Sequence, residues 1–168
     1  MASPSMRSRA RRCAGAGVAA AVLLLGCEAL AQGTGPFAVL AGTWSGGGTI
    51  SMANGASERI RCRAAYNVGA AGRAVQLSIR CASSSYNFDL AGNVVDQGGA
   101  ISGTWSESTR GVSGTVSGRA SGSQVQAYAQ GAGFSAGLSL STHGNHQSVV
   151  IRPSGADVSA VQIALARR

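Results

Sequence analysis

The chain of 168 residues contains no lysine and only 12% charged residues, so all 14 of its basic residues are arginines. A surface that binds nucleic acid usually mixes lysine with arginine and adds stacking aromatic side chains. Aromatic residues make up only 5% of this chain. We therefore expect no nucleic-acid partner.

The sequence also has few of the residues that favour helices, because leucine and glutamate are scarce and lysine is absent. No segment repeats apolar residues with a period of 3.6. The chain instead has 25 glycines and much serine, threonine and valine, and apolar residues alternate with polar ones along many short segments. This alternation is typical of strands and predicts an all-β domain.

The longest apolar stretch, Cys13–Cys27, is too short to cross a bilayer. It follows a segment with four arginines and no acid, and Ala29-Leu30-Ala31 comes shortly after it. This order of parts is that of a secretory signal peptide. We expect residues 1–31 to be a signal peptide cleaved between Ala31 and Gln32. Residues 32–168 then form a single domain, periplasmic or secreted, with ten arginines and five acids.

A second processing route remains open. Leu24-Leu25-Gly26-Cys27 resembles the lipobox of bacterial lipoproteins, in which the cysteine is lipidated. Lipidation at Cys27 would anchor the domain to a membrane of the envelope, whereas cleavage after Ala31 would free it.

Two cysteines, Cys62 and Cys81, remain after cleavage at Ala31, and they predict one disulfide. Residues 59–81 alternate on both sides of the turn Gly69-Ala70-Ala71-Gly72, as an antiparallel hairpin does. Folding about the centre of that turn gives these facing pairs: Val68–Val75, Tyr66–Leu77, Ala64–Ile79 and Cys62–Cys81. The cysteine spacing and the apolar pattern therefore select the same register.

The remaining strands are expected at Leu40–Met52, Tyr86–Leu90, Ala100–Glu107, Val112–Ala120, Gln124–Gln130, Phe134–Thr142, Gln147–Arg152 and Val158–Leu165. Short turns join them, including the hairpin signal Asn54-Gly55. We predict a small antiparallel up-and-down β-barrel of about eight to ten strands, in which the last strand pairs with the first.

Two segments repeat the pattern apolar-x-Gly-Thr-Trp-Ser, at Leu40–Ser45 and Ile101–Ser106. Trp44 and Trp105 either seal the barrel or, with Tyr66, line a cavity for a small ligand. In each repeat the glycine two residues before the tryptophan shares its face, which predicts that this glycine makes room for the indole.

The Gly-Thr-Trp pattern resembles the first strand of avidins and the Gly-x-Trp strand of lipocalins, which are exported ligand-binding barrels. More broadly, GTWSGGGTI, SERIRCRAAY and ISGTWSESTRGVSG resemble an uncharacterised family of exported β proteins from α-proteobacteria related to the rhizobia. That resemblance implies export and a β fold. Trp44 with the Cys62–Cys81 pair also resembles periplasmic metalloprotease-inhibitor barrels.

The sequence contains no clear catalytic or metal-binding motif. Gly133-Phe134-Ser135-Ala136-Gly137 matches the nucleophile motif of α/β-hydrolases, but here it lies within a predicted strand and not between a strand and a helix. His143 and His146 flank a predicted turn. Two histidines are too few for a structural zinc site, which needs four ligands. We expect no catalytic residues, no metal site and no cofactor, and therefore no enzymatic activity.

In the predicted register, Arg59, Arg61, Arg63 and Arg80 point out of the hairpin, and Arg63 faces Arg80. Like charges in direct opposition are mildly destabilising, and an anionic partner or a nearby acid, Glu58 or Glu107, would offset them. The alternative is a solvated face whose guanidinium groups stack apart and hinder aggregation. We predict a non-enzymatic exported barrel that binds a small or anionic ligand. The alternative is a periplasmic protease inhibitor or an envelope-structure protein that acts through protein contacts.

Overall fold

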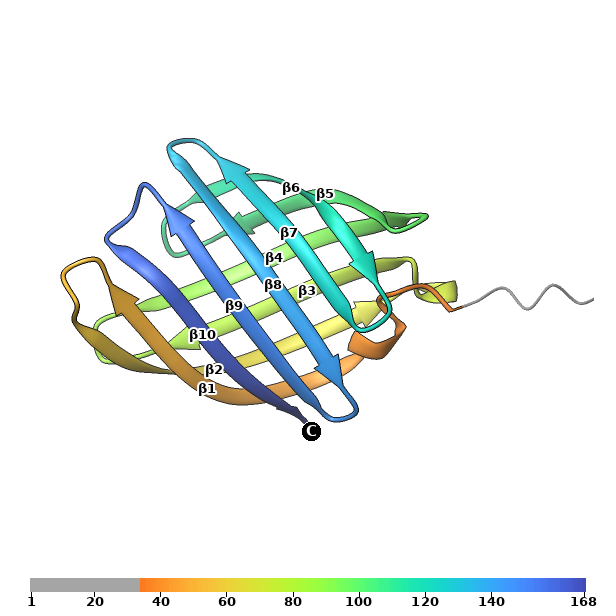
Figure 1. Ribbon diagram of the computed structural model, residues 1–168, viewed down its shortest axis with the longest axis horizontal. Coiled ribbons are helices and arrows are strands. Elements are labelled where there is room, and N and C mark those ends of the chain that lie inside the picture. The colour runs from red at the N-terminus through yellow and green to blue at the C-terminus, as the bar shows by residue number, and fades with distance from the viewer. Residues whose placement is uncertain (1–33) are drawn as a thin grey trace, which may run out of the picture. The chain divides into compact units, whose positions relative to one another are not determined.

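The alternation of apolar and polar residues produces ten antiparallel strands, which close into a barrel (Figure 1). The computed structural model describes residues 34–168. The expected signal peptide, with Cys27 and the cleavage site Ala31–Gln32, lies outside the described residues. The strands are β1 (Gly42–Met52), β2 (Ser57–Val68), β3 (Ala74–Ala82), β4 (Asn87–Gln97), β5 (Ala100–Glu107), β6 (Val112–Ser121), β7 (Gln124–Gly131), β8 (Phe134–His143), β9 (His146–Ser154) and β10 (Val158–Arg167). Two short 3₁₀ turns, η1 (Ala38–Leu40) and η2 (Ala70–Gly72), complete the described elements.

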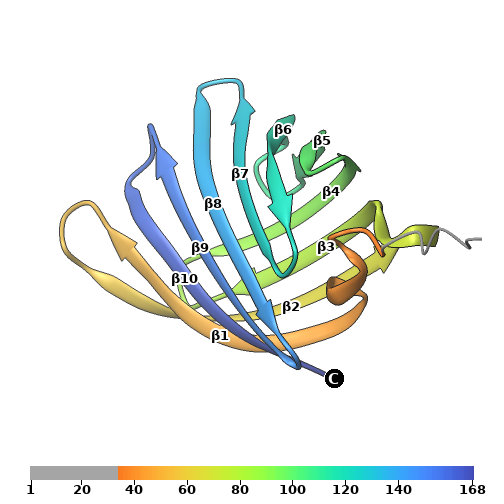
Figure 2. The same cartoon turned by 45° about the vertical axis from the view of Figure 1, so that its right-hand side comes forward.

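Each strand pairs with its neighbours in the sequence, and β10 pairs with β1. The predicted up-and-down topology is confirmed. In both views β7–β10 cross in front of β2–β4, as opposite walls of one barrel do (Figure 2). Closure leaves no strand edge unpaired, which removes the usual template for edge-to-edge aggregation.

The barrel is apolar inside and polar outside. Along β2, for example, Ile60, Cys62, Ala64 and Tyr66 are buried and the residues between them are exposed. The core draws on nearly every strand and on the segment before β1, which contributes Phe37 and Leu40. Twelve further apolar residues packed against this core remain only partly buried, among them Leu77, Leu140 and Ile151.

The predicted hairpin register of β2 and β3 is confirmed at all four facing pairs. Cys62 and Cys81 form the disulfide, with their Cα atoms 4.1 Å apart. Asn54-Gly55 forms the predicted turn between β1 and β2: Gly55 has a φ of 88°, and Asn54 Oδ1 accepts a hydrogen bond from Ala56 N.

The prediction for β4 was wrong in its extent, because the strand continues past Leu90 to Gln97. Ala91-Gly92-Asn93 lacks large side chains and so gives little strand signal. In the barrel, Gly92 faces inward between Leu77 of β3 and Trp105 of β5. A Cβ at Gly92 would lie 3.3 Å from Leu77 Cγ, so Leu77 would have to shift slightly to admit a larger residue there.

Several glycines allow close approach between strands. A Cβ built at any of them would overlap a backbone carbonyl oxygen of the adjacent strand, and they are Gly46, Gly48, Gly103, Gly114 and Gly118. At Gly114 of β6 the clashing atom is the carbonyl oxygen of Gln130 on β7. Glycines at such positions let strands bend enough to close a barrel.

Candidate functional site

Alternation along β2 places Arg59, Arg61 and Arg63 in one row on the outside of the barrel. All three are exposed, and the residues between them point into the core. None of the three makes an ion pair with another residue within 34–168. The predicted outward row is therefore present, and its charge has no acidic partner among these residues.

Arg63 lies directly opposite Arg80 of β3, as predicted. Arg80 in turn lies opposite Asp89 of β4, and its Nε is 2.8 Å from Asp89 Oδ2. Both side chains are at least one-third exposed, and such a surface pair contributes less than about 1 kcal/mol. Asp89 therefore offsets part of the charge of Arg80, and Arg63 retains its own.

The two acids expected to neutralise this row, Glu58 and Glu107, accept hydrogen bonds from backbone N–H groups instead. The Glu58 carboxylate accepts a hydrogen bond from Ser85 N, and this bond lowers the pKa of Glu58. Glu107 lies at the end of β5 and stabilises a turn, as described below. The expectation that Glu58 or Glu107 pairs with the row was wrong, because each carboxylate is taken up by backbone N–H groups close to it.

A fifth arginine joins the surface from the far end of the chain. Arg168 follows β10, which pairs with β1, and its Nε donates to Ser45 Oγ of β1. Ser45 lies opposite Arg63. We call Arg59, Arg61, Arg63, Arg80 and Arg168 the arginine face. Sequence reasoning missed Arg168; the predicted pairing of the last strand with the first was the one signal that pointed to it.

Two open grooves, of about 800 and 670 Å³, lie along this face. The first is lined by Arg59 and Arg61 and the second by Arg61, Arg63, Arg80 and Arg168. Arg61 belongs to both grooves. Its ladder neighbours are Gly47 on β1 and Ala82 on β3, so no large side chain stands on either side of it.

Trp44 is almost fully buried, with 1% of its surface exposed. Its Nε1 donates to the carbonyl oxygen of Leu40 at 2.8 Å, and the guanidinium of Arg167 lies 4.3 Å from its ring centroid. Arg167 also donates to the carbonyl oxygens of Ala41 and Val39. Trp44 and Arg167 thus fasten the segment before β1 to one end of the barrel.

Tyr66 lies on β2 near this end, and its hydroxyl donates to Gln147 Oε1 at 2.9 Å. Gln147 Nε2 donates in turn to Thr142 Oγ1. Burial raises the pKa of Tyr66, and the hydrogen bond to Gln147 opposes this shift only in part. All three residues are buried, so they form a hydrogen-bonded polar cluster inside the barrel.

Trp105 lies on β5, three strands from Tyr66 around the barrel, in the register row Tyr66–Leu77–Gly92–Trp105. Its Nε1 donates to the carbonyl oxygens of Thr115 and Gln130, and its ring meets Phe134 edge-on at 5.7 Å. The structure therefore places Trp44 and Tyr66 together and Trp105 apart from them. Their assignment as ligand-binding residues stays a prediction.

The glycine that makes room for the Trp105 indole is Gly131, where a Cβ would lie 3.0 Å from Cζ2. Gly103, two residues before the tryptophan, is small for another reason: a Cβ there would overlap the Asn93 carbonyl oxygen. The sequence interpretation of the Gly-Thr-Trp repeat was wrong on this point, because the indole reaches across to β7.

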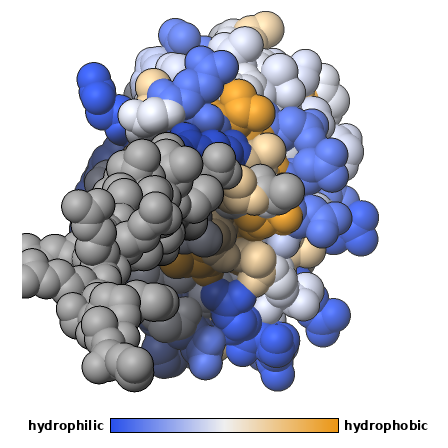
Figure 3. Space-filling model, turned by 90° about the vertical axis from the view of Figure 1, so that its right-hand side faces the viewer, coloured by the Kyte–Doolittle hydropathy of each residue, from blue (hydrophilic) through white to orange (hydrophobic). Residues whose placement is uncertain are grey.

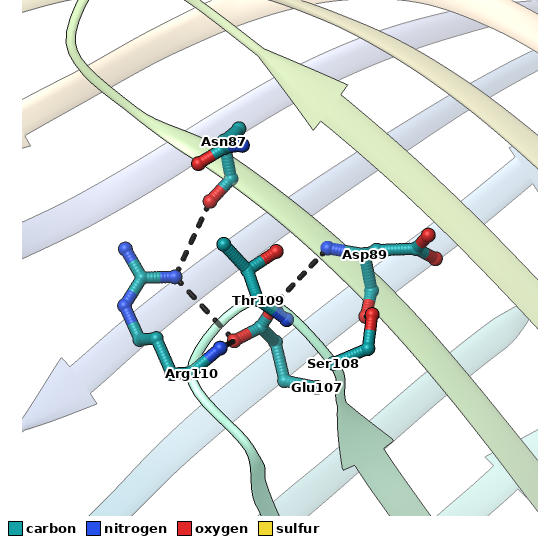
Figure 4. A network of polar contacts seen from close by, with 6 residues as sticks. All are labelled: Asn87, Asp89, Glu107, Ser108, Thr109 and Arg110. Atoms are coloured by element: carbon teal, nitrogen blue, oxygen red, sulfur yellow. Dashed lines mark hydrogen bonds and ion pairs between the residues drawn. The ribbon is translucent and has the colours of Figure 1, made fainter.

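The carboxylate of Glu107 binds backbone N–H groups of the turn between β5 and β6 (Figure 4). It accepts hydrogen bonds from the backbone N of Asp89, Thr109 and Arg110, at 2.8–3.0 Å, and Arg110 Nη1 lies 3.5 Å away. Burial alone would raise the pKa of Glu107, but these hydrogen bonds outweigh it and lower the pKa to about 2. The carboxylate thus joins β4 to the turn.

The residues of the weaker motifs are spread out. Ser135 lies near the start of β8, with no helix after it, and His143 ends the same strand. His143 pairs with His146 across the β8–β9 turn, and both are exposed. Residues 34–168 contain no group of three or more metal-ligating side chains placed to bind an ion.

No protein-family model matches the chain, and no curated protein matches it closely enough to count as a relative. In the part of the chain that the structure describes, no helix has the length and apolarity needed to span a membrane. The Cys62–Cys81 disulfide indicates an oxidising compartment outside the cytoplasm.

Proposed function

We propose that this protein is an exported, non-enzymatic β-barrel that binds an anionic ligand through the arginine face. The observation that carries this proposal is the row Arg59, Arg61 and Arg63, which is exposed and has no acidic partner within residues 34–168. Guanidinium groups bind carboxylate, phosphate and sulfate through paired, charge-assisted hydrogen bonds.

The energetics favour an external partner. Five arginines share the face, and Asp89 is the one acid that pairs with any of them among the described residues. Positive charge concentrated in shallow grooves raises the local concentration of anions and speeds their association. A bound anion would also relieve the repulsion between the opposed side chains of Arg63 and Arg80.

Export is supported by the signal-like segment 1–31 and by the disulfide. Intact mass measurement of the protein recovered from its native host tests this part of the proposal. We expect a chain that begins at Gln32. A mass that matches a diacylated chain beginning at Cys27 would support the lipoprotein route, and an uncleaved chain in the cytoplasm would contradict export.

Retention of residues 32–168 on heparin and on anionic vesicles tests the binding. We expect retention that weakens as salt rises, and that the double variant Arg61→Ser/Arg80→Ser largely loses. The matched control is Arg119→Ser/Arg152→Ser, which removes the same charge from exposed positions on β6 and β9. An equal loss of retention in both double variants would show that retention depends on net charge alone. That result would contradict binding through the arginine face.

A second candidate is a small apolar ligand inside the barrel. It is favoured by the inward apolar side chains that remain partly buried, among them Leu77, Val125 and Leu140. Apolar residues also gather in the middle of the face seen in Figure 3, between hydrophilic ones. Native mass spectrometry of the protein from its own periplasm tests this candidate, since a co-purifying small molecule would support it and an unliganded mass would not.

A further inference from the structure

We propose that the anion bound by the arginine face is a linear acidic polysaccharide lying along the outer side of β2. This inference rests on the proposed function and adds the class of ligand. It follows from the shape of the two grooves, from the side chains that line them, and from what those linings lack.

The two grooves run end to end and make one track. The first contains Gly48, Thr49 and Arg59, and the second contains Ser45, Gly46 and Arg63, which lie further along the same pair of strands. Arg61 and Ala82 line both. From Arg59 to Arg63 the strand advances about 13 Å, and the arginines repeat about every 6.6 Å, so charge is distributed along a line and not focused at a point.

Hydroxyl groups lie beside the guanidinium groups along this track, since Thr49 is opposite Arg59 and Ser45 is opposite Arg63. The lining serines and threonine are Ser45, Thr49, Ser78, Ser83 and Ser84. A sugar chain with one acid group on each unit presents the matching pattern, since its acid groups accept from guanidinium and its hydroxyls exchange hydrogen bonds with serine and threonine.

The track has no apolar anchor. Large exposed apolar residues within 34–168 are Val39, Val95 and Tyr128, and none of them lines either groove. Protein interfaces usually depend on buried aromatic or aliphatic anchors, and proteins that settle on bilayers usually insert apolar side chains. The lining therefore favours a polysaccharide over an acidic protein or a lipid surface.

Arg61 is the central contact of this track. It lines both grooves, and its neighbours Gly47 and Ala82 leave it open on both sides. A chain that runs the length of the track must pass it, whereas a single small anion at either end need not.

Titration calorimetry of residues 32–168 with size-defined oligogalacturonates, linear chains with one carboxylate per sugar, tests the inference. We expect affinity to rise about tenfold or more from the disaccharide to the hexasaccharide, and to level off once the chain spans the track. Arg61→Ser is expected to weaken hexasaccharide binding about tenfold, and the control Arg119→Ser less than twofold. Ala82→Leu, which narrows the track without changing charge, is expected to weaken it by a similar factor to Arg61→Ser.

The outcomes separate this inference from the proposed function. Affinity independent of chain length, or inorganic sulfate or polyphosphate bound as tightly as the hexasaccharide, would overturn the polysaccharide and leave anion binding intact. Binding to anionic vesicles without binding to oligogalacturonate would also overturn it. Failure to bind heparin, vesicles and oligogalacturonate alike would remove both proposals together.

Discussion

Arg63 and Arg80 lie directly opposite each other on β2 and β3, yet within residues 34–168 only Arg80 has an acidic partner, because Asp89 is the next residue across the sheet. The opposition follows from the same register that joins Cys62 to Cys81 one position along. The disulfide and the concentration of positive charge are therefore two results of one strand pairing, on opposite sides of the sheet.

Replacing Asp89 with Asn is expected to strengthen anion binding at little cost in stability. The change removes the acid that, among residues 34–168, pairs with the arginine face, and it leaves the arginines in place. An exposed ion pair contributes less than about 1 kcal/mol. The measurement is the salt concentration at which the protein elutes from heparin, which should rise. Asp157→Asn removes the same charge from an exposed position outside the face, so an equal rise there would contradict the prediction.

Loss of the disulfide is expected to destabilise the barrel by about 3 kcal/mol, because an open chain gains more freedom on unfolding than a cross-linked one. Cys62→Ala/Cys81→Ala should show this in chemical denaturation. The double variant should unfold at the same denaturant concentration with and without reductant, whereas the unsubstituted protein should become less stable when reduced. A reduced protein as stable as the oxidised one would count against this role.

Glu107→Gln is expected to lower stability most at neutral pH. The pKa of Glu107 is about 2 in the folded protein against an ordinary value of 4.5, so the folded state favours the charged form. The charged carboxylate contributes on the order of 2–3 kcal/mol to the free energy of unfolding. This contribution is fully present above pH 4.5 and is lost as the pH falls towards 2.

Thermal unfolding of the Glu107→Gln variant and of the unsubstituted protein across this range checks the sign. Their difference should shrink as the solution becomes acidic. Asp157→Asn serves as the control, because its carboxylate lies on an exposed turn. A difference that stays constant with pH would show that Glu107 acts by packing and not by charge.

Gly114→Ala is expected to cost about 3 kcal/mol or more, because the added methyl group would overlap the Gln130 carbonyl oxygen and push β6 away from β7. Gly137→Ala is the matched control, since a Cβ there has no atom within 4 Å. In urea denaturation, Gly114→Ala should unfold at a clearly lower urea concentration than Gly137→Ala. Equal stabilities would mean that the barrel relaxes around Gly114 without strain.

Much of the fold was predictable because it is encoded locally. Alternation along each segment separates inward from outward residues without knowledge of the neighbours, and the spacing of Cys62 and Cys81 added an independent constraint on register. The same reasoning failed at β4, where Gly92 carries little local signal and lies opposite Leu77 and Trp105 of the adjacent strands.

By itself, the sequence determined which residues face the core, how β2 pairs with β3, and that Arg59, Arg61 and Arg63 form an outward row, since all three depend on a period of two and one short turn. Only the tertiary structure decided that Arg168 reaches Ser45, that Asp89 and not Glu58 or Glu107 pairs with an arginine of this face, Arg80, and that Gly131 accommodates Trp105. These contacts join residues through barrel closure, across adjacent strands or, for Trp105 and Gly131, between β5 and β7 on either side of β6. They depend on the relative positions of whole strands, which no local pattern of residues records.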